Sequence, residues 1–167
     1  MKRFLVFGLV CFLIFLTTLS CDTVVGNQTI YLVRHAEKDT MDKSDNPPLI
    51  EEGYARANRL FELLDTVNFS KVYSTKYERN LNTVKPLVDA KSIDLKIYEW
   101  HDWHNDVDQI IKNEGVYLIC GHGDNLLPMI EYMGGKIPME ELGHYEYKNL
   151  FKVVRENGKV EVEVIEF

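Results

Sequence analysis

Short apolar runs alternate with amphipathic segments along most of the 167-residue chain. Residues 29–33 and 116–120 are continuous runs rich in apolar and β-branched side chains, which is typical of strands buried in a parallel sheet. Shorter strands are predicted at 72–73 and 95–98. The segments between the strands repeat apolar residues every three or four positions, and this spacing predicts helices at 49–64, 77–88, 106–111 and 125–133.

The last part of the chain has a different pattern. Two runs rich in apolar residues, 150–154 and 160–165, flank Asn157-Gly158, which is a strong signal for a tight hairpin turn. The element order is therefore β-α-β-α-β-α-β-α followed by a hairpin. We expect an α/β domain built as a three-layer sandwich, with a mostly parallel central sheet, helices on both faces and a C-terminal antiparallel hairpin.

The first twenty residues differ in composition from the rest. Lys2 and Arg3 precede a run from Phe4 to Leu16 that is entirely apolar or Gly, and a short border of small polar residues leads to Cys21. This order is typical of a secretory signal. At about 1.5 Å per residue, the run is short for a bilayer core of about 30 Å.

A cysteine directly after Leu19-Ser20 resembles the lipobox of bacterial lipoproteins. The resemblance implies that residues 1–20 are a signal peptide, that Cys21 carries lipid and that residues 22–167 form one exported domain. We therefore expect a protein of the bacterial cell envelope, attached to a membrane through its lipid anchor only. A plain signal peptide with a soluble secreted or periplasmic product is an alternative, and so is an uncleaved anchor helix.

Charge and cysteine content exclude several classes of protein. The chain has 19 basic and 26 acidic residues and a net charge of −7. An acidic chain is a poor candidate for a nucleic-acid binder, which needs a basic surface. Three cysteines do not form a disulfide framework. Cys120 lies inside an apolar run, so we expect a buried core thiol and not a nucleophile.

Charged and imidazole side chains follow the predicted strands. In chain order, the strands are followed by Arg34 and His35, by Ser74, Thr75 and Arg79, by Glu99, and by His122 and Asp124. Because ligands bind beyond the carboxyl ends of parallel strands, we expect two histidines and two arginines to gather at one edge. Guanidinium groups match phosphate oxygens, and a neutral imidazole is a competent nucleophile. The set is suited to phosphoryl transfer without a metal or other cofactor.

Four segments in the same order resemble signatures of the histidine phosphatase superfamily, which includes phosphoglycerate mutases and acid phosphatases. These segments are VRHAEK at 33–38, PPLIEEGYARA at 47–57, VYSTKYERNLNT at 72–83 and ICGHGDNLLPMI at 119–130. The resemblance spans nearly all of residues 29–154 and implies a phosphoglycerate mutase-like fold. It also implies an enzyme that forms a phosphohistidine intermediate.

The resemblance implies a role for each matched residue. His35 would be the nucleophile, and Arg34, Arg79 and His122 would form the phosphate pocket, with His122 protonated at least part of the time. Ser74 or Thr75 would orient the pocket by hydrogen bonds.

The proton donor for the leaving oxygen is left open. Glu99 is the first candidate, because it follows a strand and the family often places an acid in this region. Asp124, two residues beyond His122, is the rival, although it could instead cap the following helix. Asp102, or no carboxylic acid at all, is the remaining alternative. Glu37 is expected to cap a helix or to pair with an arginine.

The expected activity is metal-independent hydrolysis of phosphomonoesters or of a phosphorylated protein, at a site with little material for a lid. One alternative is a catalytically silent, envelope-tethered module that binds a phosphate ligand or a protein. Another alternative is a phosphoglycerate mutase-type phosphotransferase. Export of the chain argues against it, because an exported protein would not meet glycolytic intermediates. The segment EWHDWHNDVD at 99–108 contains a His-x-x-His pair among carboxylates, but without cysteine this spacing is a weak zinc signal, and no metal site is predicted.

Overall fold

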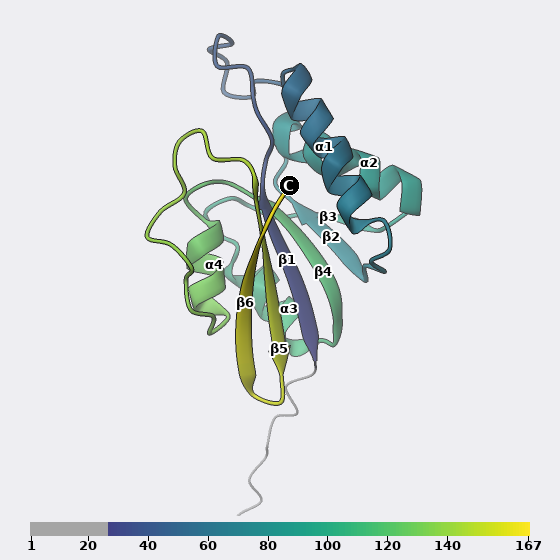
Figure 1. The fold of residues 1–167 in the computed structure, drawn as a ribbon, viewed down its shortest axis with the longest axis vertical. Coiled ribbons are helices and arrows are strands. Elements are labelled where there is room, and N and C mark those ends of the chain that lie inside the picture. The colour runs from purple at the N-terminus through teal and green to yellow at the C-terminus, as the bar shows by residue number, and fades with distance from the viewer. Residues whose placement is uncertain (1–26) are drawn as a thin grey trace, which may run out of the picture.

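The structure, a computed structural model, describes residues 27–167 (Figure 1). The expected signal peptide and the lipidation site Cys21 lie outside the described residues. No helix within residues 27–167 has both the length and the apolar character needed to cross a membrane.

A six-stranded sheet forms the middle layer of the domain. Its strands lie in the order β3 (Leu95–Ile97), β2 (Lys71–Ser74), β4 (Gly115–Gly121), β1 (Gln28–Arg34), β5 (Asn149–Glu156) and β6 (Lys159–Glu166). The first four strands in this order are parallel, whereas β5 and β6 are antiparallel to their neighbours. The expected fold class is therefore confirmed, and its antiparallel part is the C-terminal hairpin.

Helices cover both faces of the sheet. On one face lie α1 (Glu51–Leu64) and α2 (Glu78–Lys91), and on the other lie α3 (His104–Lys112) and α4 (Leu126–Tyr132) (Figure 1). Side chains of β1 alternate between the two cores: Ile30 and Leu32 pack with α3 and α4, and Tyr31 and Val33 pack with α1 and α2. Full burial of such an aliphatic side chain stabilises the fold by about 1.5–3 kcal/mol.

Helix α2 and the C-terminal hairpin turn can be compared with what the sequence pattern predicts. Helix α2 continues through Pro86, because Val84 and Leu87 are buried against the sheet and offset the hydrogen bond that proline cannot make. It ends at Lys91, and its C-cap residue Ser92 has a left-handed φ of 52°. The hairpin turn has φ values of 52° at Asn157 and 75° at Gly158, as the predicted turn requires.

The start of α1 is packed against the segment that follows β1. A Cβ atom at Gly53 would collide with the carbonyl oxygen of Glu37, so only glycine allows this approach. The same carbonyl oxygen accepts a hydrogen bond from the N–H of Ile50 at 3.0 Å. This close contact fixes the position of the loop that begins with the candidate nucleophile, His35.

Candidate active site

The carboxyl ends of β1, β2 and β4 meet at one edge of the sheet. The register pairs Arg34 with Gly121 and Ser74 with Cys120, so the residues directly after these strands are neighbours. A cavity of about 500 Å³ opens there. It is lined by Arg34, His35, Lys38, Arg79, Trp100, His122, Gly123, Asp124, Glu141, Leu142, His144 and Tyr147. The four residues predicted to carry the chemistry are thus brought together in one cavity.

His35 is 4% exposed and lies at the inner end of this cavity. Its Nδ1 is 2.8 Å from the carbonyl oxygen of Ala36, and because a carbonyl only accepts, Nδ1 carries the hydrogen and donates it. Burial is the main cause that lowers the pKa of His35 to about 3, and the charges of Arg79 and Arg34 lower it further. The imidazole is therefore neutral at neutral pH, with its lone pair on Nε2.

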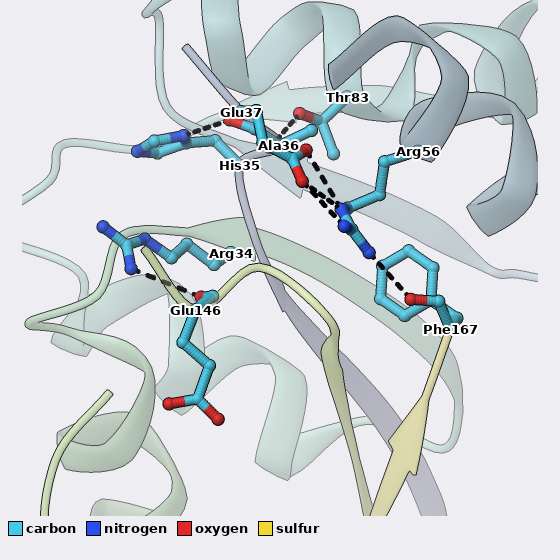
Figure 2. A network of polar contacts seen from close by, with 8 residues as sticks. All are labelled: Arg34, His35, Ala36, Glu37, Arg56, Thr83, Glu146 and Phe167. Carbon is cyan, nitrogen blue, oxygen red and sulfur yellow. Dashed lines mark hydrogen bonds and ion pairs between the residues drawn. The ribbon is translucent and has the colours of Figure 1, made fainter. Parts of the chain in front are cut away.

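Hydrogen bonds attach the residues after His35 to both helices of one face (Figure 2). The N–H of Ala36 donates to Thr83 Oγ1 at 2.8 Å, and that hydroxyl donates to the carbonyl oxygen of Arg79 at 2.7 Å. Glu37 and Arg56 of α1 form a half-buried ion pair with contacts of 2.7, 2.8 and 3.0 Å. The expected pairing of Glu37 with an arginine is confirmed.

Thr83 is a positioning residue that sequence reasoning did not single out. It lies one helical turn after Arg79, so both residues share a face of α2. This spacing of four is the signal that could have identified it.

Both predicted arginines line the cavity, and each has at least one buried guanidinium N–H group without a hydrogen-bond partner within residues 27–167. Arg79 is 5% exposed, and its Nε and Nη1 have no hydrogen-bond partner among residues 27–167. Arg34 donates through Nη1 to the carbonyl oxygens of Gly143 at 2.8 Å and Glu146 at 3.3 Å, and its buried Nε has no partner within the same residues. Since buried polar groups are nearly always paired, these donors are suited to an oxyanion in the cavity.

His122 lies opposite His35, with the ring centroids 5.5 Å apart. Its Nε2 is 3.0 Å from Thr75 Oγ1, and its ring stacks on Trp100 at a centroid distance of 4.0 Å. Burial, followed by the neighbouring charges, lowers the pKa of His122 to about 2, so the imidazole by itself is neutral at neutral pH. The protonation expected from the sequence therefore requires a negative charge beside the ring, such as a phosphoryl dianion.

The two candidate proton donors lie in different cavities. Glu99 is 70% exposed, forms a 3.8 Å ion pair with Lys76 and lines a neighbouring cavity of about 180 Å³. Asp124 lines the cavity of the histidines and accepts a hydrogen bond from Trp100 Nε1 at 3.0 Å. Trp100 lines both cavities. The structure therefore brings Asp124, and not Glu99, into the cavity of the candidate nucleophile.

Other residues near the strand ends are oriented away from the cavity. Ser74 is fully buried, and its hydroxyl donates to the carbonyl oxygen of Thr75 at 3.0 Å, so the structure does not bring this predicted phosphate-binding residue to the cavity. The N-cap residue of α4 is Asn125, not Asp124. Asn125 Oδ1 accepts a hydrogen bond from the N–H of His122 at 2.9 Å, which fixes the backbone of that histidine.

The segment between α4 and β5 forms the outer wall of the cavity. It contributes Glu141, Leu142, His144 and Tyr147. Its attachment is through Arg34, whose guanidinium carbon lies 4.7 Å from the centroid of the Tyr147 ring. The segment has neither helical nor alternating periodicity, so the sequence pattern does not predict where it packs.

The segment 99–108 and Cys120 have structural roles. His101 stacks on Trp100 and His104 stacks on Trp103, so the two imidazoles belong to separate aromatic stacks. Within residues 27–167, no group of three or more His, Cys, Asp or Glu side chains could hold a metal ion. Burial raises the pKa of the Cys120 thiol to about 12, which confirms the expected core thiol.

Residues 30–105 match the sequence model of the histidine phosphatase superfamily (branch 1). Similar folds include the α-ribazole phosphatase from Shigella flexneri, at 16% identity and a TM-score of 0.60 over 83% of this chain and 96% of that one. Phosphoglycerate mutase from Bacillus anthracis str. Sterne is 16% identical, with a TM-score of 0.67 over 86% and 94% of the two chains.

A third similar fold is phosphoserine phosphatase from Entamoeba histolytica in complex with 3-phosphoglyceric acid, at 15% identity and a TM-score of 0.61 over 84% and 98%. No curated protein matches this chain. The family model thus covers the segment from β1 to β3, and the solved structures show that the fold is shared. His122 lies beyond the matched residues, and the register of β4 with β1 brings it to the cavity.

Proposed function

We propose that this protein is a metal-independent phosphatase that hydrolyses small phosphomonoesters through a phosphohistidine on His35. One observation carries the proposal: a neutral imidazole, held by its Nδ1–H on Ala36, shares a cavity with guanidinium N–H groups of Arg79 that have no partner within residues 27–167. The nucleophile and the oxyanion donors are thus preorganised beside one another.

The reaction would proceed in two steps. In the first, the lone pair on His35 Nε2 attacks phosphorus, the bond to the ester oxygen breaks, and Asp124 gives its proton to the departing oxygen. Arg34 and Arg79 stabilise the charge on the equatorial oxygens. In the second step, water attacks phosphorus, the bond between phosphorus and His35 Nε2 breaks, and one proton of the water goes to the Asp124 carboxylate, which leaves inorganic phosphate and neutral His35.

The size of the cavity supports a small substrate. A volume of about 500 Å³ lies within the range of small-molecule sites, about 300–1,000 Å³. Two of the solved structures with this fold carry the names of phosphatases for small molecules, α-ribazole phosphate and phosphoserine. A phosphorylated protein is the alternative substrate class.

Hydrolysis of an aryl phosphate by the purified full chain, with and without a chelator, tests the proposal. We expect activity that survives chelation and falls at least about 10³-fold in His35→Ala. His104→Ala is the matched control, because His104 stacks on Trp103 and does not line the cavity. Activity retained by His35→Ala, or lost on chelation, would contradict the mechanism. A folded protein that binds phosphate without hydrolysis would support the binding module, and transfer to a second hydroxyl would support the mutase.

We also propose that the chain is exported and lipid-anchored at Cys21. The order of Lys2 and Arg3, the apolar run and the small-residue border before Cys21 support this proposal. Mass spectrometry of the mature N-terminus is the test. An acylated Cys21 is expected, and an unmodified N-terminus at any other residue would contradict lipid anchoring.

A further inference from the structure

Lys38 lines the active-site cavity, three residues beyond His35. Its backbone is held firmly: Lys38 forms a β-bridge with Leu49, and the N–H of Asp39 donates to the carbonyl oxygen of Pro48 at 2.8 Å. The start of this side chain is therefore fixed by the same packing that positions the nucleophile.

Lys38 lines the same cavity as Arg34 and Arg79. Within residues 27–167, lysines such as Lys71, Lys96 and Lys148 form ion pairs with Asp or Glu, but none of the ion pairs involves Lys38. Burial, followed by the charges of Arg79 and Arg34, lowers the pKa of Lys38. Like charges that line one cavity raise the energy of the folded protein unless an anion lies among them. The three cations thus point to a ligand that all of them contact.

We infer that Lys38 is a further catalytic residue, which binds the phosphoryl oxygens as a third cation beside Arg34 and Arg79. The inference rests on the proposed function, since it takes this cavity as the phosphoryl site. Two guanidinium groups balance a phosphate dianion, and an added ammonium gives the site a net positive charge that favours the dianion over the monoanion. The product, inorganic phosphate, carries the same charge, so it should be an effective competitive inhibitor.

Calorimetric titration of the full chain with inorganic phosphate at pH 8 tests this role. Lys43→Met is the matched control, because Lys43 is an exposed lysine of the same loop whose ammonium donates to the carbonyl oxygen of Thr40. We expect Lys38→Met to weaken phosphate binding about 10- to 100-fold. Lys38→Arg keeps the charge and should weaken binding by less than about threefold. Lys43→Met should bind as the wild type does.

The pH dependence separates a direct role of Lys38 from a structural one. As pH rises from 8 to 11, wild-type affinity for phosphate should fall as Lys38 loses its proton, whereas Lys38→Arg should keep its affinity because a guanidinium stays protonated. The other titratable groups of the cavity, which are its histidines, Asp124, Glu141, Tyr147 and the two arginines, are the same in both proteins. A difference between the two profiles therefore reports Lys38 itself.

Two results would overturn the inference: phosphate binding by Lys38→Met at wild-type affinity, or the same alkaline loss of affinity in Lys38→Arg and the wild type. The failure of the proposed function gives a different result. If the wild type binds phosphate in a Lys38-dependent way but hydrolyses no phosphomonoester, the phosphatase proposal fails and the binding role of Lys38 stands. If the wild type hydrolyses phosphomonoesters and Lys38→Met binds phosphate with wild-type affinity, the phosphatase proposal stands and the binding role of Lys38 fails.

Discussion

The inner end and the outer wall of the cavity are built in different ways. At the inner end, His35, Arg79 and His122 are each at most 5% exposed. They follow strands or begin a helix that packs on the sheet, and hydrogen bonds from buried neighbours hold them. On the outer wall, Glu141 and His144 are exposed and lie on loop and turn, and Asp124, in the turn before α4, is exposed as well. The groups that would act on phosphorus are thus rigidly supported, whereas the groups that would meet the rest of the ester lie on irregular backbone.

The two regions also differ in charge. The inner end holds the guanidinium of Arg79 and two neutral imidazoles, whereas the two carboxylates that line the cavity, Asp124 and Glu141, are exposed. This distribution of charge is suited to a substrate whose phosphoryl group lies at the inner end of the cavity. It follows that changes at the inner end should alter turnover of every phosphomonoester, and changes on the outer wall should alter turnover in a way that depends on the leaving group.

The largest effect is expected from Arg79→Met. This change removes two guanidinium N–H groups that have no protein partner within residues 27–167, so we expect kcat/KM to fall about 10³-fold for every phosphomonoester. Because the buried charge is uncompensated, the free energy of unfolding should rise by about 1 kcal/mol. Steady-state kinetics and urea denaturation measure the two effects.

Arg155→Met is the control for the loss of a half-buried arginine. Arg155 donates to Gln28 Oε1 at 3.0 Å and to the carbonyl oxygen of Ile111 at 3.4 Å, at the opposite end of the sheet. We expect unchanged kcat/KM and a loss of about 1–2 kcal/mol of unfolding free energy. If Arg79→Met instead loses stability as Arg155→Met does, Arg79 is a structural residue and the anion site is misassigned.

A smaller effect, limited to poor leaving groups, is expected from Asp124→Asn. General acid catalysis contributes about 10² or more when the departing oxygen is an alkoxide, and little when it is a stable phenolate. We therefore expect hydrolysis of an alkyl phosphate to fall about 10²-fold. Hydrolysis of 4-nitrophenyl phosphate should change by a much smaller factor. The matched variant Glu99→Gln, in the neighbouring cavity, should keep both rates. The opposite pattern would identify Glu99 as the donor.

The last expected effect is a dependence of stability on pH. The pKa values of about 3 for His35 and about 2 for His122 lie below the ordinary value of 6.5, so the unfolded chain takes up protons first as pH falls. The stability present above pH 6.5 is therefore lost progressively between pH 6.5 and about 3, by at most about 1.4 kcal/mol per pH unit for each imidazole. Urea denaturation at pH 7.5, 5.5 and 4.5 should show this loss. The slope should be shallower in His122→Gln, and an equal slope in both proteins would show that His122 is not buried as a neutral group.

The inner end could be predicted from the sequence because its residues follow regular elements. Buried strands at 29–33 and 116–120 fixed where Arg34, His35 and His122 would lie, and parallel topology brought them to one edge. Thr75 and Ser74 show the limit of this reasoning. They are adjacent, but successive side chains at a strand end point in different directions, so the hydroxyl of Thr75 contacts His122 and that of Ser74 does not.

The outer wall and the proton donor could not be predicted in the same way. Glu99 does follow a strand, but β3 ends at Ile97 on the edge of the sheet, and Trp100 lies between this strand end and the histidine cavity. The segment between α4 and β5 has no period from which burial or direction could be inferred. Its position depends on long-range hydrogen bonds from Arg34, which the sequence pattern does not reveal.

The central claim is that His35 carries the phosphoryl group during turnover. The most direct test is a single-turnover reaction of the full chain with a ³²P-labelled phosphomonoester, quenched in base and analysed by mass spectrometry. We predict a phosphoenzyme that is stable to base and labile to acid, with the phosphate on His35, and none in His35→Ala. A phosphoryl group on another residue, or hydrolysis with no phosphoenzyme at any time point, would contradict the account.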